Sequence, residues 1–384
     1  MGLPEKRRIG IIGGGQLGKM LIEASRPWNI QNIVLENDEN CPASLVADEV
    51  LVGALTDPDK IRELSNRCDI ITFEIEHIHV DVLLELESEG KLIIPSPRIL
   101  KIIQDKGAQK DFFKFHGLST VPYLLVSDQP ELVNSMEQFP GDKVVLKTRK
   151  GGYDGKGVNI VSKADILSGK YSMNEPLVVE ELLKDMVEYS VIVARDLQGN
   201  TTTFPLIEMY FHPVSNLVEF LFSPARASAE LEIACKTLAS AAIECFQGAG
   251  LFAVELFADK NGTVFINEIA PRPHNSGHHT IEGCYTSQFA QLNRILLNLP
   301  LGSTDIMKPC AMINLVGPEE MEGNYQLTHA DSLLEMEGVY IHLYNKKTMK
   351  PHRKMGHITV LANDVESLLI KAEEVKQKIG FQLV

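Results

Sequence analysis

The segment FAVELFADKNGTVFINEIAPR, residues 252–272, contains two apolar stretches separated by Asn261-Gly262. Asn-Gly between such stretches is a strong signal for a two-residue β-hairpin turn, so a pair of antiparallel strands is predicted. When residues are counted outward equally from this turn, Glu255 lies directly opposite Glu268 on the same face of the sheet. The hairpin therefore brings the Cβ atoms of two glutamates to roughly 5 Å from each other.

Two opposed carboxylates destabilise a sheet unless something positive lies between them. Mg²⁺ is the favoured guest for Glu255 and Glu268, because carboxylates and substrate phosphates are its usual ligands, and Asn267 adds an amide oxygen. The alternative is a proton shared by the two carboxyl groups, which raises the pKa of one of them. The metal is preferred because a phosphate-binding loop is predicted upstream.

That loop is RKGGYDGKGV, residues 149–158, with four glycines between Gly151 and Gly157. It separates KVVLK from VNIVS, two stretches that are typical of short strands. Glycines let the backbone close over phosphate groups and donate N–H groups to them, and Lys147 on the preceding strand adds a fixed positive charge. A phosphate-binding lid is therefore favoured over a plain hairpin loop.

Strands and helices alternate over residues 8–95, which predicts a parallel, doubly wound sheet. Near its start, GGGQLG at residues 13–18 fits the G-x-G-x-x-G pattern between a strand and a helix, where backbone N–H groups face an anion. Glu36 ends the second strand, at the place of the ribose-binding acid in a dinucleotide site. A phosphorylated ligand is expected here. A nicotinamide dehydrogenase and a purely structural turn are the alternatives.

The remainder of the chain changes character twice. Short helices and strands up to about residue 185 predict a small α+β unit. The strands that follow are longer, with a helix around residues 227–248. A tail from about residue 310 contains short strands and a final helix near residues 364–379. The fold class is thus a combination of α/β and α+β. The predicted domains are residues 1–98, residues 99–185, and residues 186–384 with a small β-rich tail.

Polar segments supply further candidate binding groups. VEELL ends an apolar strand with Glu180 and Glu181, which suit ribose hydroxyls, although solvated charges are the alternative. APRPHNSGHHT places Arg272 and His274 just beyond the hairpin. Arginine suits a bidentate oxyanion and histidine suits hydrogen bonding or proton transfer. A zinc site is disfavoured there, because no Glu or Cys follows at helical spacing.

YNKKTMKPHRKMGH, residues 344–357, gathers basic residues in an otherwise acidic chain. Beside an anionic substrate it would clamp a phosphate, and otherwise it is a solvated basic loop.

The chain carries 37 Lys and Arg against 51 Asp and Glu, a formal net charge of −14, which disfavours nucleic acid as a partner. Its six cysteines include no C-x-x-C pair, which disfavours structural zinc and a disulfide framework. The basic start is not followed by a small-residue cleavage site, and no stretch reaches the roughly 20 apolar residues that span a bilayer. A cytoplasmic protein with no membrane partner is expected.

These segments together resemble a known family. The glycine loop with Glu255 and Asn267-Glu268 resembles the ATP-grasp superfamily. GIIGGGQLGKML, ITFEIEHI, KTRKGGYDGKG, NEIAPRPHNSGHHTIE, SQF and RKMGH, which occur in this order between residues 10 and 357, resemble the 5-(carboxyamino)imidazole ribonucleotide synthases of purine biosynthesis. Asn345 stands where that family often has glycine.

The resemblance implies an ATP-grasp fold with an N-terminal pre-ATP-grasp domain that contains a parallel sheet, a central lid and a mixed C-terminal domain, usually in a homodimer. It implies carboxylation of 5-aminoimidazole ribonucleotide by bicarbonate, through carboxyphosphate, with ATP and Mg²⁺ or Mn²⁺ in its place. Because no second catalytic domain follows residue 384, the product is expected to pass to a separate mutase.

The resemblance also implies roles for individual residues, in which lysines and the loop hold phosphates, a strand end receives adenine and Glu188 binds the ribose. The ATP-binding residues would be Lys106, Lys147, Gly151, Gly152, Tyr153, Asp154, Gly155, Lys156, Gly157, Glu180, Glu181, Leu182, Leu183, Glu188, His212, Asn267 and Glu268. The ribonucleotide would contact Gly15, Gln16, Leu17, Glu74, Glu76, Lys346 and Arg353. Glu255 and Glu268 would ligate the metal, and the catalytic residues would be Arg272, His274, Asp154 and Lys346.

Three alternatives compete with this interpretation. A related ATP-grasp enzyme, such as a formate-dependent glycinamide ribonucleotide transformylase or a biotin carboxylase, is disfavoured by RKMGH and ITFEIEHI. An NAD-dependent dehydrogenase leaves the paired glutamates and the lid unexplained. A nonenzymatic nucleotide-binding protein would bind ATP without turnover.

Overall fold

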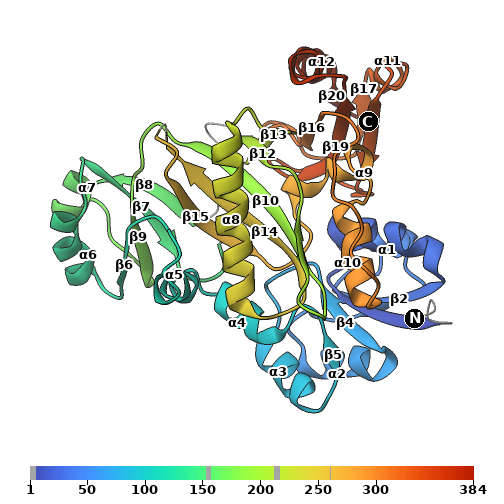
Figure 1. Ribbon diagram of the computed structural model, residues 1–384, viewed down its shortest axis with the longest axis horizontal. Helices are drawn as coiled ribbons and strands as arrows, with labels where there is room; N and C mark the ends of the chain where they lie inside the picture. The colour runs from blue at the N-terminus through green and yellow to red at the C-terminus, as the bar shows by residue number, and fades with distance from the viewer. Residues whose placement is uncertain (1–5, 153–156, 212–216, 260) are drawn as a thin grey trace.

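The computed structural model describes residues 6–152, 157–211, 217–259 and 261–384. Within these residues the strands form four sheets. Figure 1 shows the predicted lid at one end of the molecule, the large central sheet in the middle, and the N-terminal and C-terminal parts at the other end. Among the residues that the structure describes, no helix has both the length and the apolar character needed to cross a membrane.

The N-terminal sheet is parallel, as predicted, and its strand order is β3-β2-β1-β4-β5. Because β1 and β4 are neighbours, the glycine-rich turn after β1 meets Glu74, the residue after β4, at the carboxyl edge of the sheet. This edge is where open parallel sheets commonly bind ligands. The strands are β1 (Arg7–Ile12), β2 (Ile30–Glu36), β3 (Glu49–Val52), β4 (Ile70–Phe73) and β5 (Leu92–Ile93), and the helices are α1 (Gln16–Ser25), α2 (Pro58–Arg67) and α3 (Val80–Ser88).

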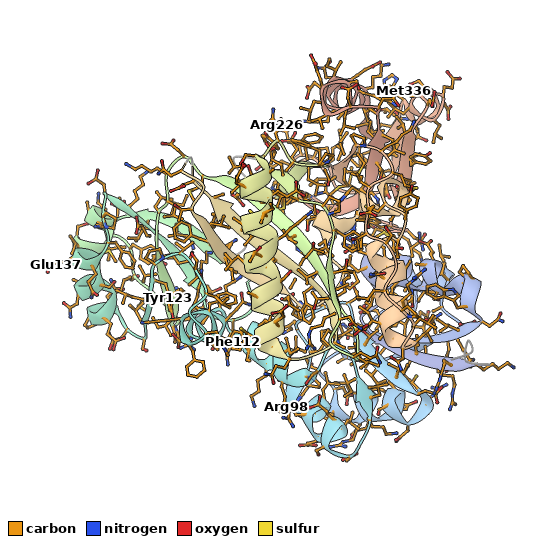
Figure 2. The ribbon with its side chains drawn as sticks, in the orientation of Figure 1. Arg98, Phe112, Tyr123, Glu137, Arg226 and Met336 are labelled. Carbon is orange, nitrogen blue, oxygen red and sulfur yellow. The ribbon has the colours of Figure 1, made fainter. Side chains whose placement is uncertain are left out.

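The second unit is a four-stranded antiparallel sheet in the order β6-β9-β7-β8. Its elements are α4 (Pro97–Ile103), α5 (Lys106–Phe115), β6 (Tyr123–Val126), α6 (Gln129–Ser135), β7 (Lys143–Thr148), β8 (Val158–Ser162), α7 (Lys163–Leu167) and β9 (Leu177–Glu181). Phe112 on α5 lies beside the end of the long helix α8 (Ala229–Phe246; Figure 2), and its ring stacks on Phe246 with centroids 4.3 Å apart. This contact ties the unit to the helix that covers the central sheet.

Asp105 fixes the start of α5. Its carboxylate accepts the N–H groups of Gly107 at 2.9 Å and Ala108 at 3.2 Å, which caps the helix. The same carboxylate forms two parallel hydrogen bonds with Arg149, at 2.9 and 2.8 Å. Lys106, the first residue of α5, is therefore held against the end of β7, where the glycine loop begins.

The central sheet is antiparallel and follows the order β15-β14-β10-β12-β13-β16-β19-β18, with β11 beside β10. β16 pairs with β13, so strands of the predicted tail continue the central sheet. The strands are β10 (Val187–Arg195), β11 (Thr201–Thr203), β12 (Ile207–Phe211), β13 (Val218–Ser223), β14 (Gly250–Ala258), β15 (Val264–Ala270), β16 (Cys310–Val316), β18 (Val339–Leu343) and β19 (Lys354–Leu361).

Two helices cover opposite faces of this sheet, as alternation along β10 requires. Val191 and Val193 pack in the cluster under α8 (Ala229–Phe246), whereas Ile192 and Ala194 pack in the cluster under α10 (Gln288–Leu296). α10 also packs against α1, where the Asn293 side chain donates to the Leu21 carbonyl at 2.9 Å. The N-terminal domain and the central sheet thus share one apolar core.

The C-terminal end adds a small two-stranded sheet and covers the outer part of the central sheet. The final helix lies close to the range expected from the sequence. These elements are α9 (Thr280–Gly283), β17 (Tyr325–Thr328), α11 (Ala330–Leu334), α12 (Val365–Lys378) and β20 (Gly380–Leu383), with short 3₁₀ turns at Arg26–Trp28, Pro42–Leu45, Met136–Gln138 and Asn275–Gly277.

Candidate active site

The hairpin of β14 and β15 forms as predicted, but its turn does not have the predicted length. The Asp259 N–H donates to the Thr263 carbonyl at 3.0 Å, so the turn comprises three residues instead of two. Continued without interruption, this register would place Glu255 opposite Asn267 and would put Glu268 on the other face.

A β-bulge restores the predicted pair. β15 contributes one extra residue, Asn267, between the two positions that pair with Glu255 and Leu256. Glu255 and Glu268 are therefore directly opposed, as the sequence analysis predicted. The bulge also lets the two consecutive side chains Asn267 and Glu268 reach the same pocket.

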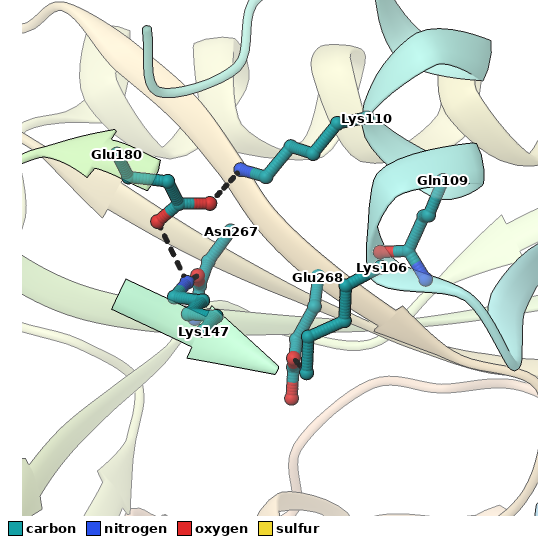
Figure 3. A pocket seen from close by; sticks show the side chains of 7 residues that line it. All are labelled: Lys106, Gln109, Lys110, Lys147, Glu180, Asn267 and Glu268. Carbon is teal, nitrogen blue, oxygen red and sulfur yellow. Dashed lines mark hydrogen bonds and ion pairs between the residues drawn. The ribbon is translucent and has the colours of Figure 1, made fainter. Parts of the chain in front are cut away.

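This pocket lies between α5, β7, β9 and β15 (Figure 3). The side chains that line it come from four separate parts of the chain and are mostly charged. They are Lys106, Gln109, Lys110, Lys147, Glu180, Asn267 and Glu268. Five of these residues were predicted from the sequence as ATP-binding residues.

Lysines neutralise the carboxylates of the pocket. Lys106 forms an ion pair with Glu268. Lys147 donates to the Asn267 amide oxygen at 2.7 Å and lies 2.8 Å from one oxygen of Glu180. Lys110 lies 2.8 Å from the other oxygen of Glu180. The pocket thus holds three cations around two carboxylates, which suits an anionic ligand.

Burial and neighbouring charges move the pKa values of the paired glutamates in opposite directions. Burial, and then the charge of Glu268, raises the pKa of Glu255 to about 8. Burial also acts against ionisation of Glu268, but the charges of Lys106 and Lys147 outweigh it and lower its pKa to about 2. Shifts in opposite directions are those expected of two carboxyl groups that share one proton, the alternative to a metal that was given from the sequence.

The predicted ribose residue Glu188 lies on β10 near this pocket. Burial raises its pKa to about 7, with Lys147 lowering it and Glu268 raising it. Glu181 is the next residue after Glu180 on β9, so its side chain points to the opposite face of the strand. Leu182 and Leu183 follow the end of β9 and are half-buried.

Arg272 and His274 connect the hairpin to the N-terminal domain. Arg272 lies 3.0 Å from Glu76, which follows β4. The His274 Nε2 lies 3.7 Å from Glu255, and its Nδ1 lies 2.9 Å from the Ser276 hydroxyl. Arg272 thus contacts the carboxyl edge of the parallel sheet, and His274, two residues later, lies beside the paired glutamates.

At that edge, carboxylates accept the N–H groups of the glycine turn. The Gly14 N–H donates to Glu36 at 2.8 Å, and the Gly15 N–H donates to Glu74 at 2.7 Å. The Glu36 carboxylate is thus engaged by the glycine turn, which argues against its use as the ribose-binding acid of a dehydrogenase. Gln16 begins α1, and the Leu17 side chain is buried in the core, so only its backbone can contact a ligand.

Burial raises the pKa of Glu74 to about 7, opposed by the Gly15 N–H and by the charges of Arg272 and Lys346. Lys346 is therefore within electrostatic reach of Glu74, although more than 270 residues separate them in the sequence. Its Nζ donates to the Lys354 carbonyl at 2.7 Å and lies 5.6 Å from the centre of the Tyr344 ring.

The turn before Lys346 accommodates Asn345 at the position where the family often has glycine. Asn345 has a φ of 56°, in the left-handed region that asparagine adopts more readily than most residues. Arg353 lies in the same connection between β18 and β19 and donates to the Thr348 carbonyl at 2.9 Å.

The glycine loop is described only at its ends. Gly151 and Gly157 have φ values of 74° and 81°. A Cβ atom on Gly157 would lie 2.4 Å from the Thr148 hydroxyl, so this position requires glycine on two counts. Gly152 adjoins the undescribed part. The predicted site residues Tyr153, Asp154, Gly155, Lys156 and His212 lie outside the described residues.

Two residues of the pocket, Gln109 and Lys110, were not predicted from the sequence. Gln109 uses both ends of its amide to bond the backbone of Ile269, at 3.0 and 3.4 Å. Lys110 is 3% exposed and contacts Glu180. The available signal was the spacing of Lys110, four residues after Lys106 on one helix face.

Comparisons with known proteins identify three families of domain along the chain. Residues 6–104 match the ribonucleotide synthetase preATP-grasp domain, residues 111–289 match the ATP-grasp domain, and residues 310–371 match the phosphoribosylaminoimidazole carboxylase C-terminal domain. The N5-carboxyaminoimidazole ribonucleotide synthase of Brucella melitensis is 36% identical over 355 residues, which cover 91% of this chain and 95% of that protein.

Solved structures are similar over nearly the whole chain. The N5-carboxyaminoimidazole ribonucleotide synthetase of Thermotoga maritima is 40% identical, with a TM-score of 0.89 over 98% of this chain and all of that one. An Aspergillus clavatus N5-carboxyaminoimidazole synthase, in complex with ADP and 5-aminoimidazole ribonucleotide, is 31% identical, with a TM-score of 0.87 over 97% of this chain and 98% of that one. The chain spans about two thirds of the length of the yeast and plant phosphoribosylaminoimidazole carboxylases that it matches.

Proposed function

The chain belongs to the N5-carboxyaminoimidazole ribonucleotide synthase family of the ATP-grasp superfamily, and we propose that it carries out the reaction of that family at the pocket described above. It is an ATP-dependent ligase of purine biosynthesis, which converts 5-aminoimidazole ribonucleotide, bicarbonate and ATP to N5-carboxyaminoimidazole ribonucleotide.

One observation supports placing phosphoryl transfer at this pocket. Lys106 pairs with Glu268, and Lys147 donates to the adjacent Asn267, beside the opposed pair Glu255 and Glu268, although these residues come from three distant segments. Two lysines suit the phosphates of ATP, and two carboxylates suit a metal bound to those phosphates. Transfer of a phosphoryl group requires such an arrangement of cations around the transferring oxygens.

The metal in this proposal is Mg²⁺, with Mn²⁺ as a substitute, held by Glu255 and Glu268 with Asn267 beside them. The donor set fits, because it consists of oxygens and because the two carboxyl groups are directly opposed across the hairpin. No cluster of three or more metal-ligating side chains occurs among the described residues, so phosphate oxygens would complete the ligands. Mg²⁺ would offset charge on the phosphates during transfer.

The reaction proceeds in two displacements. A bicarbonate oxygen attacks the γ-phosphorus of ATP, the bond to the β-phosphate oxygen breaks, and carboxyphosphate and ADP form. The exocyclic amine of the ribonucleotide then attacks the carboxyl carbon, phosphate leaves and the nitrogen loses a proton. Lys106 and Lys147 offset the charge of the transferring group, and Arg272 and His274 face carboxyphosphate.

The ribonucleotide binds at the carboxyl edge of the parallel sheet. The first backbone N–H groups of α1 face an anion there, and Lys346 and Arg353 add positive charge from the C-terminal part. Glu74 and Glu76 accept hydrogen bonds from the aminoimidazole. The ion pair of Arg272 with Glu76 keeps this end next to the phosphoryl-transfer site.

We also assign ATP contacts to the glycine loop, to the strand end around Glu180 and to Glu188, and we place the enzyme in the cytoplasm as a homodimer. The cytoplasmic assignment is supported by the six cysteines, which are all free thiols and mostly buried. The dimer is the usual state of the family, and gel filtration with light scattering tests it.

The decisive experiment measures ADP release with MgATP and bicarbonate, with and without 5-aminoimidazole ribonucleotide. Strong stimulation by the ribonucleotide is expected, because the amine must be present to consume carboxyphosphate productively. A folded protein that binds ATP but shows no stimulation would contradict the assignment of the acceptor.

A pair of variants tests the placement of the site. Lys147→Met should lose ADP release, because it removes a phosphate cation from the pocket. Lys143→Met, on the exposed start of the same strand, should leave it unchanged. Equal activity in both variants would show that the ATP phosphates do not bind in this pocket.

A further inference from the structure

Lys110 is a buried cation to which neither the family reaction nor the metal site gives a role. Its side chain is 3% exposed, and its Nζ lies 2.8 Å from the Glu180 Oε1 and 2.9 Å from the Thr120 hydroxyl. The Thr120 hydroxyl donates to the Ile266 carbonyl at 2.7 Å. Lys110 is thus held from two sides, next to the hairpin that carries the paired glutamates.

Glu180 is shared between two lysines (Figure 3). Lys147 approaches its Oε2 at 2.8 Å, while Lys110 approaches its Oε1 at the same distance. The lysines differ in their other partners. Lys147 also bonds the Asn267 amide oxygen, at 2.7 Å, in the wall that the proposed ATP phosphates would face, whereas Lys110 bonds Thr120 behind the pocket.

We propose that Lys110 is a positioning residue for ATP binding: it retains Glu180 when Lys147 turns from that carboxylate to the phosphates of ATP. The inference rests on the proposed role of Lys147 as a phosphate ligand. It adds a role for a residue that does not itself touch ATP.

The physical reason for a second lysine beside Glu180 is the cost of leaving a buried carboxylate without a cation. If Lys147 were the only partner of Glu180, its departure would leave a carboxylate that is 3% exposed without a cation, and ATP binding would bear that cost. With Lys110 in place, Glu180 keeps one ion pair throughout. The Glu180 carboxylate also stays at the end of β9, where the adenine is proposed to bind.

The positions of the two lysines in the fold support these different roles for Lys147 and Lys110. Val145 pairs with Glu180 across β7 and β9, so Lys147, two residues further along β7, projects on the same face as Glu180. Lys147 lies one residue from the end of β7, which leads into the glycine loop. Lys110 instead projects from the middle of α5, a helix whose start Asp105 and Arg149 fix.

The test compares Lys110→Met, Lys110→Arg and the control Lys114→Met, which changes an exposed lysine one turn further along the same helix. ADP affinity is measured by calorimetry, and KM is measured separately for ATP and for 5-aminoimidazole ribonucleotide. Lys110→Met should raise KM for ATP and Kd for ADP roughly tenfold or more, because a buried charged group loses its partner. KM for the ribonucleotide should stay unchanged, and Lys110→Arg should recover part of the loss.

A double variant shows whether Lys110 acts through Glu180. Lys110→Met should weaken ADP binding little further in a Glu180→Gln background, because no carboxylate remains to be retained. This pair also removes both buried charges together, so it keeps the test open if Lys110→Met alone fails to fold. Equal losses in both backgrounds, or a stability change with unaltered nucleotide affinity, would overturn the proposal. Failure of the wild-type protein to bind ADP would instead refute the proposed function.

Discussion

Glu74 connects the proposed site with the stability of the fold, because its buried carboxyl group makes the free energy of unfolding depend on pH. Glu74 is 8% exposed, and burial raises the pKa of its carboxyl group from an ordinary 4.5 to about 7. Replacing it by glutamine keeps its shape and removes the titrating proton. Glu74→Gln should therefore change how the free energy of unfolding depends on pH.

The direction in which stability changes with pH follows from the number of protons that the folded and unfolded states bind. Between about pH 4.5 and pH 7, the folded protein holds a proton on Glu74 that the unfolded chain has released, so the stability of the wild type falls as pH rises through this window. The rise of the Glu74 pKa from 4.5 to about 7 corresponds to about 3 kcal/mol. Between pH 5 and pH 8, the wild type should lose roughly 2–3 kcal/mol of stability that Glu74→Gln retains.

The single tryptophan of the chain, Trp28, makes this measurable in the right domain. It lies in the N-terminal domain with Glu74 and packs against the apolar core that this domain shares with the central sheet, so its fluorescence in urea reports unfolding of that core. The free energies of wild type and Glu74→Gln are measured at pH 5 and at pH 8. Comparing the two differences removes the pH-independent effect of placing an amide beside Gly15.

The control is Glu39→Gln, which makes the same chemical change at an exposed position of the same domain. Its difference from wild type should be the same at both pH values. If Glu74→Gln also showed no change between pH 5 and pH 8, the buried carboxyl would not titrate in this window. If the variant lost stability more steeply than wild type as pH rises, the pKa of Glu74 would be lowered by folding and not raised.

Three further variants test separate parts of the site. Gly157→Ala should lower stability by about 1–2 kcal/mol and raise KM for ATP, because its φ of 81° and the Thr148 hydroxyl both exclude a Cβ atom; an unchanged urea midpoint and KM would contradict this. Glu268→Gln should reduce kcat by roughly a hundredfold or more and raise the Mg²⁺ concentration needed for half-maximal rate, whereas an unchanged Mg²⁺ titration would remove the residue from the metal site. Asp105→Ala should cost about 2 kcal/mol or more by removing a helix cap and leaving Arg149 without its partner. Thermal unfolding measures that loss, and a cost below about 0.5 kcal/mol would show that the pair contributes little.

Local patterns predicted the elements of the fold well, because each pattern depended on near neighbours in the chain. The alternation over residues 8–95 predicted the parallel sheet, and the expected final helix lies within one residue of α12 at each end. The strand β3 was missed, since EVLV is only four residues long and mostly partly exposed. The predicted helix around residues 227–248 is α8, whose Ser228 cap accepts the Leu231 N–H.

What the sequence could not give is the environment of each charge. Lys110 resembles a surface lysine in KGAQKDFFKFHG, and only the folded chain brings Glu180 and Thr120 to it. His278 and His279 belong to a segment interpreted as an anion-binding loop, yet both are fully buried. Burial lowers the pKa of His278 well below its usual range, so it stays neutral in the folded protein.

The paired glutamates show how a correct prediction can rest on an incomplete reason. An uninterrupted ladder from the turn that actually forms would have turned Glu268 away from Glu255. The extra residue at Asn267 reverses that shift, and no turn signal in KNGTVFINE reveals it. The bulge does more than correct the register. A regular strand would point Asn267 and Glu268 to opposite faces, whereas the bulged strand brings both to Lys147 and Lys106. The irregularity therefore belongs to the site, because it places an amide oxygen and a carboxylate side by side where phosphates and a metal are proposed to meet.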